Sequence, residues 1–285
     1  MKRYTITSID SIRSGTRILE KSLGIILPLA LAVIWFIPLF WMICTAFTES
    51  STKMSLLPTT GFTFQHIKFV WSTVPFDRYY FNTISIVVCT FSVQFVFITM
   101  AAYALAVIRF KGEKLVFVII FMQIIISNDI LIIPNYLSIV DLHLANKKLG
   151  AMMPFFGSAF GIFLLRQHFK TIPSELRDAA RIDGCNLWQI IWRVYMPNSR
   201  AAYIAFGLVS VSYHWNNYLW PMIVLKSVEN RPLTVGLAIF AKSKEALMQW
   251  SNVCAAAFIV AIPLLLMFMV FQDKFINSFV RAGIK

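Results

Sequence analysis

Long apolar segments separated by short polar stretches dominate the pattern of the chain. A helix that crosses a bilayer needs about 20 mostly apolar residues, because each residue adds about 1.5 Å along the helix axis. The segments that meet this requirement cover residues 23–47, 81–108, 115–140, 149–165, 202–225 and 253–271. The fourth is the shortest, and Pro154, Gly157 and Gly161 weaken its helical pattern. The pattern therefore predicts an all-α, polytopic membrane protein with about six transmembrane helices.

The composition agrees with lipid as the solvent for much of the surface. Hydrophobic residues make up 58% of the chain and charged residues only 14%, whereas soluble domains carry about 25% charged residues. The net charge of +13 is expected where loops face anionic lipid on the cytoplasmic side, and we favour this explanation over nucleic-acid binding.

The distribution of Lys and Arg predicts how the chain is oriented. Most of the 26 Lys and Arg residues fall in segments that share one side of the membrane with the N-terminus. We therefore expect both termini in the cytoplasm. The expected organisation is a cytoplasmic tail at residues 1–22, a transmembrane domain at 23–273 with its core at about 78–273 and a cytoplasmic loop at 166–200, and a cytoplasmic tail at 274–285.

Motifs for chemistry on the chain itself are missing from the sequence. The four cysteines, Cys44, Cys89, Cys185 and Cys254, are far apart and form no Cys/His cluster. No G-x-x-x-x-G-K-[ST] motif occurs, so the chain does not hold nucleotide phosphates by such a loop. We expect no catalytic residue, no metal site and no cofactor on this chain.

The loop at 166–200 is the longest predicted cytoplasmic segment, and it has the local chemistry of a helix. Pro173 suits the first turn of a helix, and Glu175 and Asp178 complement the dipole near its N-terminus. Ala179 and Ala180 are strong helix formers with small side chains. Together they predict a short helix that starts after residue 172.

A glycine turn and a second helix follow. Gly184 suits the left-handed conformation that ends a helix. Asn186 and Gln189 have the spacing of a capping box, and Pro197 is expected to end the second helix. Two small alanines beside an acid and a turn glycine permit the close approach of a partner. The alternative is an ordinary amphipathic hairpin at the lipid headgroups, and the local pattern does not separate the two.

The spacing of this loop resembles the EAA motif in permease subunits of binding-protein-dependent ABC importers. That motif reads Glu-Ala-Ala, three residues, Gly, nine residues, then Ile-x-Leu-Pro. The matching positions here are Asp178, Ala179, Ala180, Gly184, Val194, Met196 and Pro197. The segments 172–176, 182–184, 215–221 and 233–237 are similar to further landmarks of the carbohydrate-importer branch, most of all to the second permease of maltose-type transporters.

The resemblance implies a type I ABC importer permease fold and a set of partners. These are a second permease subunit, two ATPase subunits that bind ATP and Mg, and an extracytoplasmic solute-binding protein, in a bacterial cytoplasmic membrane. The chain would form half of a path for a carbohydrate, with an oligosaccharide favoured over a monosaccharide. The loop would seat in the ATPase, and the residues assigned to this coupling are Glu175, Asp178, Ala179, Ala180, Arg181, Asp183, Gly184 and Pro197.

Two groups of polar residues inside predicted spans are candidates for the substrate path. Asn128 and Asp129 lie within the third span, where they either line a cavity or join helices. The fifth span combines amides with aromatic rings, which suit sugars but also suit an interfacial aromatic belt. The candidates there are Tyr213, Asn216, Asn217 and Trp220. The scattered His143, His168 and His214 receive no role.

Other functions stay open at this point. The same machinery with a phosphorylated polyol as cargo is the first alternative. A secondary transporter is the second, although it predicts an internal repeat or several intramembrane charges. A membrane-bound enzyme would need a nucleophile–base pair or a metal cluster near a span end.

Overall fold

The computed structural model describes residues 4–49, 61–108, 110–244 and 249–283. These residues are helical or lie in turns, and the β pairing among them is one antiparallel bridge between Thr48 and Phe62. The all-α prediction is therefore confirmed. The helices are α1 (Tyr4–Phe47), α2 (Gln65–Thr73), α3 (Phe76–Val107), α4 (Glu113–Ile125), α5 (Ile132–Asp141), α6 (Lys148–Met152), η1 (Met153–Phe155), α7 (Ala159–Lys170), α8 (Ser174–Ile182), α9 (Leu187–Ile190), η2 (Ile191–Tyr195), α10 (Met196–Asn198), α11 (Arg200–Asn216), α12 (Leu219–Val224), η3 (Val228–Asn230), α13 (Leu233–Phe240) and α15 (Trp250–Gly283).

Three of the described helices are long and apolar enough to cross a membrane: Gly24–Phe47, Phe76–Val107 and Trp250–Gln272. A fourth span results if the pair Lys148–Phe155 and Ala159–Lys170, bent by 44°, is counted as one. This pair corresponds to the predicted fourth segment. The bend lies next to the residues that weaken its helical pattern, because Pro154 lies in the 3-10 turn η1 that follows α6, and Gly157 precedes α7.

The prediction of continuous helices across 115–140 and 202–225 is wrong. The first breaks after Ile125 and resumes at Ile132, and the second breaks at Asn217 and resumes at Leu219. In the first break Ser127 Oγ accepts a hydrogen bond from the Asp129 amide at 3.4 Å. Short polar side chains of this kind compete with the helix for backbone hydrogen bonds, and an apolar pattern alone does not reveal that competition.

The predicted tails are largely helical. Helix α1 begins at Tyr4 and continues into the first span, and α15 runs from the last span to Gly283. Residues 1–3 and 284–285, which complete the predicted tails at 1–22 and 274–285, lie outside the described residues. Which side of the membrane these segments occupy stays a prediction.

The chain divides into two compact units, and the smaller comprises residues 1–72 and 243–259. His66 connects its parts from a buried position. The ring contacts Asn252 Oδ1 through Nδ1 at 2.8 Å and the Thr48 carbonyl through Nε2 at 3.1 Å. Phe47 adds a T-shaped contact to Phe258, with ring centroids 5.4 Å apart. These contacts join the end of α1, the start of α2 and the start of α15.

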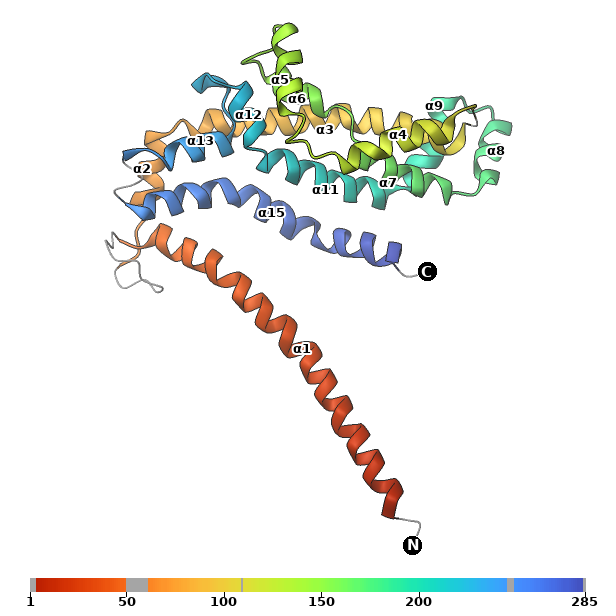
Figure 1. Ribbon diagram of the computed structural model, residues 1–285, viewed down its shortest axis with the longest axis horizontal. Helices are drawn as coiled ribbons and strands as arrows, with labels where there is room; N and C mark the ends of the chain where they lie inside the picture. Colours follow the sequence, from red (N-terminus) through yellow and green to blue (C-terminus); the bar gives the residue numbers. More distant parts are fainter. Residues whose placement is uncertain (1–3, 50–60, 109, 245–248, 284–285) are drawn as a thin grey trace. The chain divides into compact units, whose positions relative to one another are not determined.

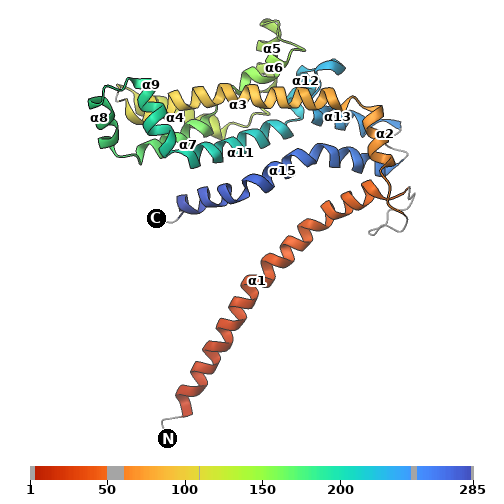
Figure 2. The same cartoon turned by 180° about the vertical axis from the view of Figure 1, so that it is seen from behind.

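The larger unit comprises residues 73–242 and 260–285. Its centre is formed by α3, α7 and α11, which contact one another pairwise (Figures 1 and 2). Gly161 of α7 allows this close packing, because a Cβ there would lie 2.6 Å from the Phe206 ring and 3.1 Å from Ile98. Small residues at such positions let membrane helices approach closely.

The two ends of α3 hold different parts of the larger unit. At its N-terminal end, Asn82 donates to the Glu229 and Arg231 carbonyls, and the Thr83 hydroxyl accepts from the Leu233 amide. At its C-terminal end lie the α8 and α9 helices (Figure 1). The 32 residues of α3 correspond to about 48 Å of helix, so these two regions are separated by roughly the thickness of a membrane.

Candidate functional site

The α8–α9 hairpin has the helix, glycine turn and second helix that the sequence predicted, but Pro173 is the N-cap of α8 and not part of its first turn. Pro173 precedes α8 with φ −57° and ψ 136°, which is the extended conformation of a residue that flanks a helix start. Asn186 and Gln189 form both hydrogen bonds of a capping box, at 2.8 and 2.9 Å, and so begin α9.

Gly184 makes the turn between the two helices. Its φ is +77°, and the Gly184 and Cys185 amides donate to the Arg181 and Ala180 carbonyls at 3.0 and 2.9 Å. This pair of bonds is a Schellman motif, in which a left-handed residue satisfies the last carbonyls of a helix. The left-handed turn expected from the sequence is therefore confirmed.

The second helix ends one residue later than expected. Its last turns contain a π-helical segment, η2, and the helix continues through Pro197 to Asn198 before α11 begins at Arg200. Pro197 has no N–H to donate, which weakens the regular ladder before it. The Asn198 side chain donates to the Val194 carbonyl at 2.7 Å and satisfies one acceptor of this region.

Most residues assigned to coupling lie on the exposed face of this hairpin. The exposed ones are Glu175, Asp178, Ala179, Arg181, Asp183, Gly184 and Pro197. Ile182, which the resemblance included in the landmark at 182–184 but not among the coupling residues, is also exposed, with 87% of its surface accessible.

Ala180 differs from the rest of this set. It is only 9% exposed and packs in a core cluster with Tyr103, Phe169 and Ile190 of its own chain. The close approach of a partner that the sequence suggested for both alanines therefore applies to Ala179. Ala180 instead packs inside its own chain, where α8 contacts α9 and η2.

Asp178 is held as a carboxylate on this surface. The Arg177 guanidinium donates to its Oδ1 at 3.0 Å. This hydrogen bond lowers the pKa of Asp178, with further help from the charges of Arg177 and Arg181. The side chain therefore presents a negative charge at neutral pH, next to two cations.

A cavity of about 250 Å³ lies near the middle of α3, within the larger unit. Of the predicted path residues, Asn128 and Tyr213 line it, and Asn128 Nδ2 donates to the Tyr213 hydroxyl at 2.9 Å. The other polar residues in its wall are Gln94, Gln123, Ser158, Ser210 and His214. No Lys, Arg, Asp or Glu is among the described residues that line this cavity.

A buried hydrogen-bond network supports the cavity wall. Gln94 Nε2 donates to the Phe155 carbonyl at 2.6 Å, and the Ser210 hydroxyl donates to Gln94 Oε1 at 2.6 Å. Gln94 Nε2 also lies 3.2 Å from His214 Nε2, which accepts in the tautomer that carries its proton on Nδ1. The network joins α3, η1 and α11, and it makes the wall polar and uncharged.

The remaining predicted path residues do not line this cavity. Asp129 and Asn216 are exposed, and Asn216 Nδ2 donates to the Ser212 carbonyl of its own helix. Asn217 accepts a hydrogen bond from Thr234 through its carbonyl. Trp220 is 4% exposed and donates to the Ala151 carbonyl at 3.1 Å, so it packs in the core of this chain and away from the cavity wall.

Sequence reasoning missed Gln94, Ser210 and His214. A lone amide inside an apolar span was the available signal for Gln94, because such groups turn towards protein or a cavity. His214 was given no role because an isolated histidine is usually packed. His214 is indeed buried, and it also forms part of the cavity wall. Among the described residues, no group of three or more His, Cys, Asp or Glu gathers as a metal site.

Comparison with known proteins places the chain in a family. Residues 95–281 match the family described as "binding-protein-dependent transport system inner membrane component". The lactose transport system permease protein LacG of Rhizobium radiobacter is 28% identical over 242 residues, which cover 85% of this chain and 88% of the relative. The sn-glycerol-3-phosphate transport system permease protein UgpE of Yersinia enterocolitica is 29% identical over 238 residues, which cover 80% and 83%.

A solved structure has the same fold. The crystal structure of a bacterial ABC transporter involved in the import of the acidic polysaccharide alginate aligns with a TM-score of 0.79 and 27% identity, over 92% of this chain and 98% of that one. The family match covers well over half of the chain, and the hairpin and broken spans described above agree with it. The chain therefore belongs to the binding-protein-dependent transport system inner membrane components: it is a multi-pass permease subunit of an ABC importer and not an enzyme.

Proposed function

We propose that this permease receives the motion of an ATPase through α8 and passes it to a path for a neutral carbohydrate. The observation that carries the proposal is the α8–α9 hairpin. It combines a glycine-terminated helix, an exposed Ala179 and the mixed charges of Glu175, Asp178 and Arg181. A small side chain in the middle of a charged, exposed helix face suits insertion into a cleft of a partner. Asp183 and Gly184 complete the end of this face, and Pro197 lies beyond it.

The proposed partners follow from this role. A second permease subunit completes the path, two ATPase subunits hold ATP and Mg, and an extracytoplasmic solute-binding protein delivers the cargo. The permease itself needs no cofactor in this arrangement. Both termini and α8 lie in the cytoplasm of a bacterial cell, since most Lys and Arg residues fall on that side.

The uncharged cavity supports a neutral cargo over a phosphorylated or acidic one. Amide, hydroxyl and imidazole groups exchange hydrogen bonds with sugar hydroxyls, and the Tyr213 and Phe155 rings offer apolar faces. An anion in a low-dielectric path calls for a cationic partner, usually Arg or Lys. Asn128 and Tyr213 are the proposed substrate contacts, whereas Asp129, Asn216 and Asn217 are not needed for them.

The coupling role is tested by cross-linking and transport in the complete complex. Ala179→Cys, in a background without native cysteines, is expected to cross-link to the ATPase, whereas Lys111→Cys in the exposed α3–α4 turn serves as the control. Asp178→Lys is expected to abolish binding-protein-stimulated ATP hydrolysis and uptake, because it reverses the charge on the docking face. Normal uptake by Asp178→Lys, or equal cross-linking from both cysteines, would contradict the proposal. Uptake by this chain without any ATPase would favour a secondary transporter.

The cargo is tested by competition for uptake. Neutral oligosaccharides are expected to compete with one another, while sn-glycerol-3-phosphate and uronate oligosaccharides do not. Tyr213→Phe and Asn128→Ala are expected to raise the KM for uptake about threefold to tenfold, the effect of one lost hydrogen bond of about 1 kcal/mol. Tyr218→Phe and Asn216→Ala, which lie outside the cavity wall, are the matched controls. Uptake restricted to the anionic cargo would overturn the assignment.

A further inference from the structure

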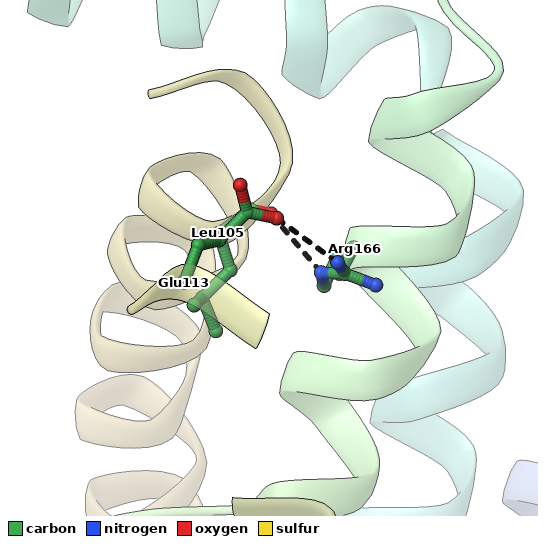
Figure 3. Close-up of polar contacts among 3 residues, drawn as sticks. All are labelled: Leu105, Glu113 and Arg166. Carbon is green, nitrogen blue, oxygen red and sulfur yellow. Dashed lines mark hydrogen bonds and ion pairs between the residues drawn. The ribbon is translucent and has the colours of Figure 1, made fainter. Parts of the chain in front are cut away.

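Arg166 forms a buried junction between three helices near the end of α7 (Figure 3). The residue is 7% exposed. Its Nε donates to the Leu105 carbonyl at 3.0 Å, and its Nη2 lies 3.1 Å from Glu113 Oε1. Its guanidinium carbon lies 3.8 Å from the centre of the Phe117 ring. One side chain of α7 thus contacts α3 through Leu105 and α4 through Glu113 and Phe117.

The contacts of Arg166 with Leu105 and Glu113 involve polar groups at the ends of two helices. The last carbonyls of a helix lack partners within it, and Leu105 lies in the last turn of α3. Glu113 begins α4, where a carboxylate is favourable. Arg166 lies in the second half of α7, just before its last turn. A planar guanidinium donates in two directions while it stacks on a ring, which an ammonium group does not do.

The same turn of α7 leads directly to α8. Phe169, three residues after Arg166, is buried and contacts the Tyr195 ring with centroids 5.2 Å apart, and Tyr195 contacts Tyr103 of α3 at 5.1 Å. Only three residues separate α7 from α8, and two of their amides, those of Thr171 and Ile172, donate back to the end of α7. The connection is therefore short and hydrogen-bonded.

The helices that Arg166 joins also carry the cavity wall. Gln94 lies on α3, 11 residues before Leu105 and so about 16 Å along the helix. Gln123 lies on α4, six residues after Phe117 and so about 9 Å along it. A displacement of the ends of α3 and α4 is therefore also a displacement of residues around the cavity.

We propose that Arg166 is a positioning residue that ties α7, which continues into α8 through the short link at 171–173, to the cytoplasmic ends of α3 and α4, so that α3, α4 and α7 move together with α8 and the ATPase. This inference rests on the proposed coupling role of α8. Without the junction, α7 would follow α8 while the ends of α3 and α4 stayed in place, and ATP would be hydrolysed without an equal opening of the path. The residue acts on transport through helix positions and touches neither cargo nor nucleotide.

The test compares variants in the complete complex, reconstituted with the partner permease, ATPases and loaded binding protein. The readout is the amount of cargo transported per ATP hydrolysed. Arg166→Gln is expected to lower this ratio about tenfold, within the range for residues on a coupling path. Two conservative variants are each expected to lower this ratio about threefold. Arg166→Lys keeps the positive charge but not the planar guanidinium, and Glu113→Gln keeps the side-chain shape but not the negative charge. Lys170→Gln, an exposed cation one turn further along α7, is the control and should leave the ratio unchanged.

Two further measurements separate this inference from a purely structural role and from the proposed function. The Tm of the complex and the cross-link from Ala179→Cys to the ATPase should be retained in Arg166→Lys and Glu113→Gln. A ratio equal to that of the parent in all three variants would overturn the inference. The inference would also be overturned if transport fell in these variants only to the extent that the Tm or the assembly of the complex fell. If Ala179→Cys does not cross-link to the ATPase in a complex that retains Arg166 and Glu113, the coupling role of α8 is overturned instead.

Discussion

At the scale of single residues, Gly184 shows how backbone conformation and space make separate demands. A Cβ added to Gly184 would meet no atom within 4 Å, yet its φ of +77° is one that other L-residues adopt at a cost. The position therefore calls for glycine because of the turn that it makes and not because of crowding. Ala180 is the opposite case, since its small size matters for packing within its own chain.

Gly184→Ala should weaken the α8–α9 turn without preventing assembly. The expected cost is about 1 kcal/mol, because only the left-handed conformation is penalised. Hydrogen exchange of the Gly184 and Cys185 amides should become faster, and transport should fall. Gly24→Ala is the control, since Gly24 is helical and a Cβ there also meets no atom within 4 Å. Unchanged exchange at residues 184–185 would show that the turn does not depend on glycine.

At the scale of elements, α7 has two functions in one helix. Its first half packs closely on α3 and α11 through Gly161, and its second half holds Arg166 and Phe169. Helix α3 likewise supports the loops at one end, Gln94 near its middle and the Arg166 junction at the other end. Rigid elements that carry both a partner-facing end and cavity residues suit the transmission of a motion between two discrete states.

Gly161→Ala should destabilise the three-helix contact. The added Cβ would lie 2.6 Å from Phe206, so the helices must separate or the ring must move, at about 1–3 kcal/mol. The Tm of the detergent-solubilised protein should fall measurably. Gly207→Ala is the matched control, because its Cβ would lie at an ordinary 3.4 Å from Phe91. Equal Tm values for the two variants would mean that α7 is not held closely at this point.

At the scale of the whole molecule, the chain combines continuous and broken helices with the α8–α9 hairpin, for which we propose a docking role. Three described helices are long and apolar enough to span, with a bent pair as a fourth. The broken helices place non-helical backbone around Asn128, beside the cavity. Such backbone is tolerated at membrane depth where it is buried in protein or lines a water-filled cavity.

The orientation of the molecule is testable with cysteines in opposite loops. Lys111→Cys, in the α3–α4 turn that is predicted to be cytoplasmic, should react with a membrane-impermeant maleimide only after the cytoplasmic side is opened. Lys226→Cys, in the loop after α12, should react from outside. The expectation follows from the concentration of Lys and Arg on the cytoplasmic side. Labelling in the reverse pattern would place α8 outside the cell and would contradict a role in ATPase coupling.

Local chemistry made much of the candidate coupling surface predictable. The Pro173 start, the Gly184 turn and the Asn186 cap each depend on residues within about five positions of one another. Apolar composition likewise predicted the all-α class and the spans at α1, α3 and α15. The helix breaks at Ile126 and Asn217 were missed, because an apolar pattern continues through them and only backbone hydrogen bonding interrupts it.

The sequence by itself determined that this protein is a helical membrane component with a helix–glycine–helix hairpin of EAA spacing. These properties depend on composition and on contacts between near neighbours in the chain. Only the tertiary structure decided which polar residues meet. Gln94 and Ser210 are 116 positions apart, and Arg166 and Glu113 are 53 positions apart. Such pairs form because helices pack in one register, and that register is set by the sum of many contacts such as the one at Gly161. The same helix packing turned Trp220 and Ala180 inward, although Trp220 was expected to face a substrate and Ala180 a partner.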